Sequence, residues 1–280
     1  MKRKLLTCLI PVFVVAALLH RYTFANSTYD SVGGAAYRGT FIGGASVSAG
    51  ALQLTSTYQG LSLPIGDFDY YNSISVEMWV TTQGGSWPWY SYYVGYPYNN
   101  RWCKLFQFGQ GTGSSTESTI AVYRERSNGY LYMFIGDQAY CSYVGFDSQT
   151  NLHIVLTVAA GDFAKLYVNG ALAVTASYPL PVIPSPGYFR IGYGYYNVDN
   201  EYFIGSVSEF RIWGGVLSAS EVIANYFAGN GKIMNSDGHF LMPNLPLIFF
   251  YFIILSSQKT CVRAVSQAES DAVPPLLQVN

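Results

Sequence analysis

The chain is a succession of short segments in which apolar and polar residues alternate, separated by glycine, asparagine, serine and proline. Alternation with a period of two is typical of strands that bury one face. Almost no helical periodicity occurs before residue 218. The pattern predicts two packed antiparallel sheets, with strands at residues 51–54, 61–64, 74–81, 104–108, 119–125, 129–135, 151–159, 165–168, 171–176, 188–193 and 203–213.

Two motifs support this interpretation locally. Asn169-Gly170 separates two alternating segments and predicts a hairpin, because both residues accept the positive φ angles of a type I′ turn. Ser218 stands three residues before Glu221, the spacing of a capping box at a helix start, and Gly229 marks the helix end.

The strand before this helix is predicted to have two distinct faces. Val207, Glu209 and Arg211 point to one side of the strand if the alternation is regular. Ser208, Phe210 and Ile212 then point to the other side.

In order, these segments resemble the laminin-G-like domains of the concanavalin A-like lectin/glucanase superfamily. The likeness rests on EFRIW at 209–213, LSASEV at 217–222 and ISVEMWV at 74–80, and it covers residues 47–228. It implies an antiparallel β-sandwich, a concanavalin A-like jelly roll, with one short C-terminal helix.

Changes in composition divide the chain into four parts. Residues 1–25 begin with Lys2-Arg3-Lys4, continue through an apolar run and end on small residues at Ala25, as secretory signal peptides do. An uncleaved membrane anchor is the alternative for this run. Residues 26–46 form a leader with room for one edge strand, and residues 47–230 form the domain. We therefore expect a secreted protein or one on the extracellular cell surface.

The tail at residues 231–280 has a different composition. Residues 245–255 are strongly apolar but fall short of the about 20 residues that a membrane span needs. Counting residues 240–257 would allow one span, with Lys259 and Arg263 on the cytoplasmic side. A membrane-associated tail and a tail that is not native coding sequence are the alternatives that the sequence leaves open.

Charge excludes one class of partner. Removing residues 1–25 leaves 11 basic and 16 acidic residues, a formal net charge of 11 − 16 = −5. Nucleic-acid binding proteins hold phosphates with clustered lysine and arginine. The mature chain is acidic and lacks a basic run, so we expect no nucleic-acid partner.

Two cysteines of the predicted domain are placed to form a disulfide. Cys103 and Cys141 both lie in the predicted domain, and an oxidising compartment favours pairing. We expect a Cys103–Cys141 disulfide, with Cys261 left over. Two free buried thiols are the alternative.

Catalytic residues are poorly represented. Glycosidases of this superfamily carry an E-x-D-x-x-E run on one strand, because the reaction needs two carboxylates around the glycosidic bond. The strand at 74–81 carries Glu77 alone, which we interpret as a solvated side chain. The three histidines are too scattered to indicate a zinc site or a triad. We expect no enzyme.

Aromatic residues are dense at 84–102, which reads GGSWPWYSYYVGYPYNNRW. Aromatic faces stack on the C–H faces of sugars, and tyrosine hydroxyls form hydrogen bonds with them. An aromatic hairpin over a sheet edge would give the same composition. The candidate ligand-binding residues are Trp87, Trp89, Tyr90, Tyr92, Tyr93, Tyr96, Tyr98 and Trp102, and a second cluster adds Tyr195 and Tyr196.

The resemblance also suggests a structural calcium ion, since many laminin-G-like domains hold one. Asp67, Asp69, Asp199 and Glu209 are the candidate ligands. Surface turns collect aspartate in any case, because it tolerates turn backbone.

Together these features predict a non-catalytic module that binds glycans or extracellular proteins. A structural or adhesion protein that uses aromatic patches for protein contact is the first alternative. A divergent glycoside hydrolase is the second.

Overall fold

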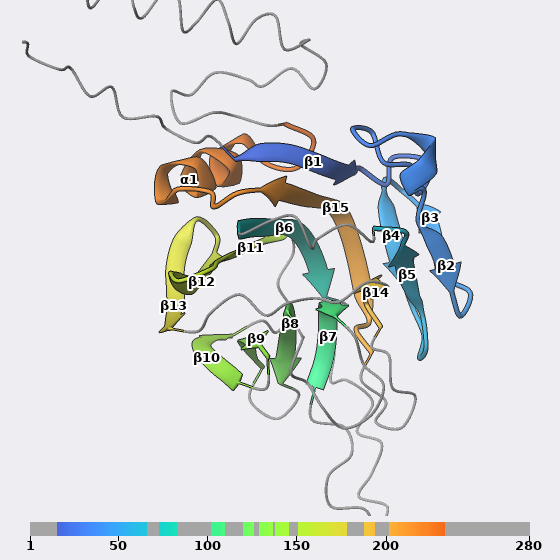
Figure 1. Ribbon diagram of the computed structural model, residues 1–280. Coiled ribbons are helices and arrows are strands. Elements are labelled where there is room, and N and C mark those ends of the chain that lie inside the picture. Colours follow the sequence, from blue (N-terminus) through green and yellow to red (C-terminus); the bar gives the residue numbers. More distant parts are fainter. Residues whose placement is uncertain are drawn as a thin grey trace, which may run out of the picture. The chain divides into compact units, whose positions relative to one another are not determined.

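The computed structural model describes residues 16–65, 73–82, 102–109, 120–125, 129–136, 138–145, 151–177, 188–193 and 202–232. All of them belong to one compact unit, Met1–Leu241. They form two antiparallel sheets packed face to face, with a short 3-10 helix η1 (Ala35–Tyr37) and one α-helix (Figure 1). The predicted β-sandwich jelly roll with one C-terminal helix is confirmed.

One sheet, called sheet A, has eight strands. Its main path runs β13 (Ala171–Ser177), β12 (Phe163–Val168), β11 (Leu152–Ala159), β6 (Ser73–Thr82), β15 (Gly205–Gly214), β4 (Ala51–Leu54) and β3 (Ser46–Ser48). The eighth strand, β1 (Ala17–Tyr22), pairs with the C-terminal half of β15. β4 pairs with the N-terminal end of the same strand. β15 therefore has β6 along one side and two partners in succession along the other.

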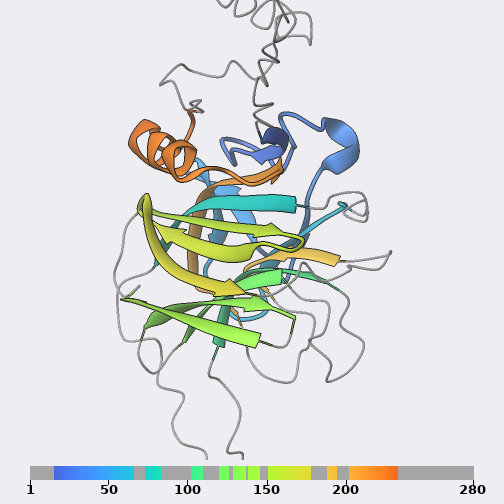
Figure 2. The same ribbon diagram turned by 60° about the vertical axis from the view of Figure 1, so that its left-hand side comes forward.

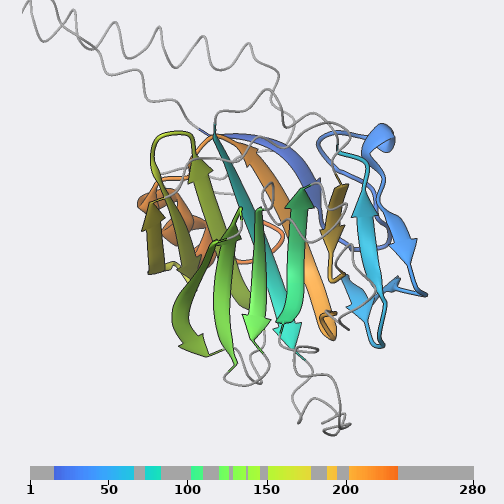
Figure 3. The same cartoon turned by 60° about the horizontal axis from the view of Figure 1, so that its bottom comes forward.

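The second sheet, sheet B, has seven strands (Figure 3). Their order is β10 (Gln138–Gly145), β9 (Tyr130–Ile135), β8 (Ile120–Glu125), β7 (Trp102–Gly109), β14 (Tyr188–Ile191), β5 (Gly60–Leu63) and β2 (Thr40–Ile42). The sequence prediction lacks four of the strands, β1, β2, β3 and β10. It allowed for one edge strand in the leader, residues 26–46. That leader supplies β2 at the edge of sheet B and the first residue of β3 at the edge of sheet A.

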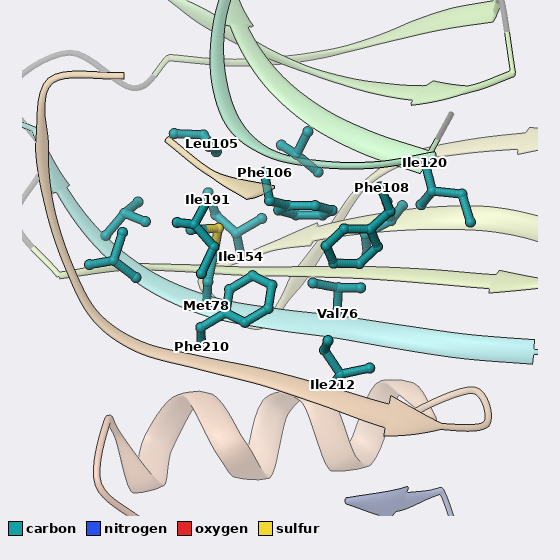
Figure 4. Close-up of a cluster of buried hydrophobic side chains, with 14 of the residues drawn as sticks. Val76, Met78, Leu105, Phe106, Phe108, Ile120, Ile154, Ile191, Phe210 and Ile212 are labelled. Carbon is teal, nitrogen blue, oxygen red and sulfur yellow. The ribbon is translucent and has the colours of Figure 1, made fainter. Parts of the chain in front are cut away.

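The core lies between the two sheets (Figure 4). Phe210 from β15 points toward Phe106 and Phe108 from β7, with ring centroids 6.0 and 6.2 Å apart, respectively. Both pairs are edge-to-face, the arrangement that aromatic rings prefer. All three side chains are fully buried. This cluster joins the sheets at the centre of the sandwich.

A β-bulge changes the predicted faces of β15. Between Val207 and Glu209 the register with β6 shifts by one residue. As a result Val207 joins Phe210 and Ile212 in the core, whereas Glu209 and Arg211 lie on the outer face. The regular alternation that places Val207 with Glu209 and Arg211 is therefore wrong, because a bulge inserts a residue into one strand only.

The predicted hairpin and helix are both confirmed. Asn169 and Gly170 have φ angles of 50° and 80° between β12 and β13, as a type I′ turn requires. Helix α1 (Ala219–Ala228) begins with a full capping box between Ser218 and Glu221 and ends at Gly229. None of the described helices is both long and apolar enough to cross a membrane.

Helix α1 covers part of the outer face of sheet A (Figure 2). Val222 of α1 is fully buried in a small apolar cluster with Trp213, Leu217 and Val155. Sheet A therefore has apolar side chains on both faces, one against sheet B and one against α1.

The predicted Cys103–Cys141 disulfide is absent, so this prediction is wrong. Cys103 lies on β7 and Cys141 on β10, and β8 and β9 separate these strands in sheet B. Three strand spacings of about 4.8 Å place the two strands about 14 Å apart. A disulfide joins Cα atoms that are at most about 7 Å apart, so the sheet itself prevents the bond.

Candidate functional site

The outer faces of the two sheets differ in what covers them. Sheet A carries α1 on its outer face, whereas no helix or strand among the described residues packs on the outer face of sheet B. That face nevertheless carries large side chains. We call it the polar-aromatic face and define it by Lys104, Gln107, Tyr123, Glu125, Tyr132, Phe134, Tyr188 and Arg190.

Its position follows from the alternation along each strand. On β14, Phe189 and Ile191 belong to the core, so Tyr188 and Arg190 point outward. On β9, Leu131, Met133 and Ile135 belong to the core, so the residues between them point outward. The outer positions hold aromatic and charged residues rather than the small polar residues of an ordinary solvated sheet.

Lys104 and Glu125 bring opposite charges to one end of this face. The Lys104 Nζ lies 5.2 Å from the centroid of the Tyr123 ring, within the range of a cation–π interaction. The Tyr123 ring in turn packs on Phe134, with centroids 4.4 Å apart. Tyr132 donates a hydrogen bond of 2.7 Å from its hydroxyl to Glu125 Oε2. Rings and charged groups are therefore interleaved across β7, β8 and β9.

A second group lies on the neighbouring strands β7 and β14. Gln107 and Arg190 are register partners, and Gln107 donates a hydrogen bond of 3.0 Å from Nε2 to the Tyr188 hydroxyl. The Arg190 guanidinium lies 5.1 Å from the centroid of the Tyr188 ring. Gln107 Oε1 is buried, and among the described residues none donates a hydrogen bond to it.

The polar-aromatic face continues onto one rim of the sandwich. Arg190 also lies 5.6 Å from the ring centroid of Tyr193, which follows β14. The Tyr58 ring packs against Tyr193 and Tyr202, with centroids 6.4 and 6.1 Å apart. We call Tyr58, Tyr193 and Tyr202 the rim tyrosines. Tyr58 is 43% exposed, so part of this cluster faces solvent.

The aromatic residues singled out in the sequence, Trp87 to Tyr98 together with Tyr195 and Tyr196, lie outside the described residues. Trp102 begins β7, where its backbone pairs with Glu125. The segment 83–101 follows β6 and precedes β7. Thr82, the last residue of β6, pairs with Gly205, which lies shortly after the rim residue Tyr202. Trp102 is the first residue of β7. Tyr193 directly precedes the segment 194–200.

Sequence reasoning missed Lys104, Gln107, Tyr188 and Arg190. They are scattered over two predicted strands, 104–108 and 188–193, and only the pairing of β7 with β14 brings them together. The outward positions of those strands carried the signal, because they hold long polar and aromatic side chains.

A different cluster, on the outer face of sheet A, contains several buried charged residues. We call it the Glu77 network: Arg21, Glu77, His153, Glu209, Arg211, Trp213 and Asn225. Glu77 Oε1 lies 2.8 Å from His153 Nε2, and Glu77 Oε2 accepts hydrogen bonds from Arg211 and Trp213 at 3.1 and 3.0 Å. Glu77 has no solvent exposure, so its interpretation as a solvated side chain is wrong.

Glu209, a candidate calcium ligand, belongs to the same network. Its Oε1 accepts hydrogen bonds from Arg21 Nε at 2.7 Å and Arg211 Nε at 2.6 Å, and its Oε2 accepts one from the backbone of Gly231. Both oxygens of this carboxylate therefore accept hydrogen bonds within the fold. Asp67, Asp69 and Asp199 lie outside the described residues, among which no group of three acidic, histidine or cysteine residues could hold a metal.

The network makes stability depend on acid pH. Burial alone would raise the pKa of Glu77, but Arg211 and His153 outweigh burial and lower it below its ordinary value. Burial is likewise outweighed at Asp30, whose pKa is lowered by hydrogen bonds from His20 and from backbone N–H groups.

We expect the free energy of unfolding to fall as the pH drops below about 4, near the unfolded pKa values of these carboxyls. A carboxyl with a lowered folded pKa stabilises the fold above its unfolded pKa, and this stabilisation disappears as the pH falls through the folded pKa. Thermal melts from pH 7 to pH 2 measure the effect. The Glu77→Gln variant should lose less stability over this interval, and an equal loss would contradict the assignment to Glu77.

Comparison with known proteins assigns the chain to a superfamily. A family model described as "Concanavalin A-like lectin/glucanases superfamily" matches residues 55–223, more than half of the chain. No curated protein is significantly similar to the chain in sequence.

Solved structures share the fold at low identity. Domain 4 of the extracellular arabinanase AbnA from Geobacillus stearothermophilus, solved with arabinotriose, has a TM-score of 0.56 and 21% identity over 74% of this chain and 97% of that domain. Trypanosoma rangeli sialidase has a TM-score of 0.54 and 15% identity over 76% of this chain and 32% of the enzyme. Botulinum neurotoxin type C, whose cell entry depends on two ganglioside molecules, has a TM-score of 0.52 and 13% identity over 76% of this chain and 51% of that structure. The chain thus spans about a third of the sialidase and half of the neurotoxin structure.

Proposed function

We propose that this chain, which belongs to the concanavalin A-like lectin/glucanases superfamily, binds glycans on the polar-aromatic face of sheet B and the adjoining rim tyrosines. The observation that carries the proposal is the interleaving of aromatic rings with hydrogen-bonding side chains across adjacent strands. Sugars present both C–H faces and hydroxyls, so a surface that recognises them needs both kinds of group side by side.

Tyr188, Arg190 and Gln107 form the centre of the proposed site. The Arg190 guanidinium is planar and lies over the Tyr188 ring, which holds its donors in a fixed direction. Gln107 supplies an amide oxygen that is buried and still able to accept a hydrogen bond. A sugar hydroxyl that reaches this oxygen would supply the hydrogen bond that Gln107 lacks, and burying an unpaired acceptor is costly. The site therefore favours a ligand rich in hydroxyl groups.

The fold neighbours are consistent with such a role. The arabinanase domain is known in complex with arabinotriose, and the neurotoxin depends on gangliosides. These are properties of those proteins, and they support the class of ligand rather than a particular sugar.

The proposal is for binding without catalysis, by a secreted or cell-surface protein. Glycosidases use a pair of carboxylates around the scissile bond. On the described part of the polar-aromatic face Glu125 is the one carboxylate, and it is 3% exposed and accepts a hydrogen bond from Tyr132. We therefore assign Glu125 the role of orienting the Tyr132 hydroxyl.

For a glycan that binds, replacing Arg190 with alanine should weaken affinity about tenfold or more, since it removes both hydrogen-bond donors and the cation between Tyr188 and Tyr193. Binding is measured by calorimetry with arabinotriose, a sialylated ganglioside oligosaccharide and a β-glucan oligosaccharide. Melting curves confirm that the variant is folded.

Arg38→Ala is the matched control. Arg38 also lies over a tyrosine, 4.7 Å from the Tyr29 ring centroid, but it precedes β2 and is exposed. It should leave affinity within about twofold of the original. Equal affinities for the original, Arg190→Ala and Arg38→Ala proteins would mean that the glycan site lies elsewhere. If the original protein bound none of the three saccharides, the proposal of glycan binding would be wrong.

A further inference from the structure

Strand β1 occupies part of the segment that the sequence pattern assigns to a signal peptide. Its residues pair with β15 from Ala17 opposite Gly214 to Tyr22 opposite Phe210. Because β4 pairs only with residues 205–207 of β15, β1 is the strand that covers the other half of that edge. A signal peptide that ended at Ala25 would remove β1 from the mature sheet.

The side chains of β1 are built into the domain. Tyr22 has no solvent exposure and donates a hydrogen bond of 2.8 Å from its hydroxyl to the Tyr37 carbonyl. Phe24, just after the strand, is also fully buried in the main core. His20 Nδ1 lies 2.6 Å from Asp30 Oδ2, and Asp30 Oδ1 accepts a hydrogen bond of 2.9 Å from the Arg21 backbone. Residues 26–46 are thus anchored through β1.

Arg21 also completes the charge balance of the Glu77 network. Two carboxylates, Glu77 and Glu209, face two guanidinium groups, Arg21 and Arg211, in a buried region. Without Arg21, the two buried carboxylates would share a single guanidinium partner, Arg211. Removing one partner of a buried ion pair is strongly destabilising, because the other charge is left buried and uncompensated.

Residues upstream of β1 satisfy the requirements of a signal by themselves. Lys2-Arg3-Lys4 supply the positive start, residues 5–15 supply an apolar run, and Ala16 supplies the small residue before a cut. An apolar run of 7 to 15 residues is the usual length in signal peptides. Val14, three residues before that cut, is compact and uncharged.

We propose that the secretory signal of this chain ends at Ala16 and that signal peptidase hydrolyses the Ala16–Ala17 peptide bond. Water adds its hydroxyl to the Ala16 carbonyl carbon as the C–N bond breaks, and the remaining proton goes to the Ala17 nitrogen. The products are a signal peptide with an Ala16 carboxyl end and a mature chain with Ala17 at its amino end. That chain begins with the first residue of β1 and keeps Arg21.

The first experiment expresses the full chain in a eukaryotic secretory host and sequences the amino end of the secreted protein. A start at Ala17 supports the proposal. A start at Asn26 or any other residue, or an uncut chain that begins at Met1, overturns it. Two variants sharpen the result, because a bulky residue before the cut blocks the peptidase: Ala16→Leu should abolish cleavage, and Ala25→Leu should leave it unchanged. Ala25 is exposed, so its replacement leaves the fold intact.

A second experiment tests the structural argument without any processing. Two chains, residues 17–280 and 26–280, are produced without a signal and compared by thermal melting. The longer chain should melt cooperatively, and the shorter one should be aggregated or lack a cooperative transition. Equal melting temperatures would show that β1 is dispensable and would overturn the reason for the proposed cut.

Discussion

Replacing Glu77 with alanine is expected to destabilise the protein by about 3 to 5 kcal/mol, the usual cost of removing one partner from a buried charged pair. Glu77 accepts hydrogen bonds from Arg211 and Trp213 and lies 2.8 Å from His153, and it has no contact with solvent. Its loss would leave the Arg211 guanidinium with Glu209 as its carboxylate partner, in a region from which water is excluded. Denaturant unfolding at pH 7 measures the change.

Two variants make this expectation specific. Glu77→Gln keeps the shape and one acceptor oxygen, so it should lose less stability than the alanine variant. Asp162→Ala removes an exposed carboxylate whose described bond is to the adjacent Phe163 N–H, and it should change stability by at most about 0.5 kcal/mol. A Glu77→Ala loss as small as that of Asp162→Ala would show that the network contributes little.

Replacing Phe210 with alanine is expected to cost about 3 to 5 kcal/mol, as for other large aromatic side chains in well-packed cores. Phe210 connects the two sheets through edge-to-face contacts with Phe106 and Phe108 (Figure 4). Its removal opens a cavity where residues of both sheets meet, and paired strands on either side limit how far the backbone can close it. The midpoint of thermal unfolding should fall accordingly.

Phe227→Ala is the matched control, since Phe227 of α1 is 79% exposed. It removes the same number of atoms without opening a cavity, and its expected effect is within about 0.5 kcal/mol. Similar losses for the two variants would mean that the sheets adjust freely around position 210.

Much of the fold could be predicted from the sequence because strands with one buried face alternate in polarity. The helix was predicted from Ser218, Glu221 and Gly229, whose roles are local. Strand β10 was missed because it is an edge strand with several exposed positions, so it lacks regular alternation. The bulge at Val207 was missed for a different reason, since it depends on pairing with β6 and leaves no mark in the sequence of β15.

The candidate site was less predictable than the fold. The density of rings drew attention to residues 84–102, whereas Gln107, Tyr188 and Arg190 become neighbours only when β7 pairs with β14. Glu77 was misjudged because its burial depends on α1, which lies far along the chain and covers the outer face of sheet A. Alternation along a strand assigns each side chain to one face of the sheet. It does not show whether another part of the chain covers that face.

Both ends of the described chain leave the sandwich from one side. Ala16 packs with the apolar cluster beneath α1, and the Lys232 carbonyl accepts a hydrogen bond from Arg211 on the outer face of sheet A. The polar-aromatic face belongs to the other sheet and points away from both attachment points. A sequence joined at either end is therefore tethered behind the domain. In the proposed role, several copies on one support would present their polar-aromatic faces outward together, a geometry suited to multivalent binding.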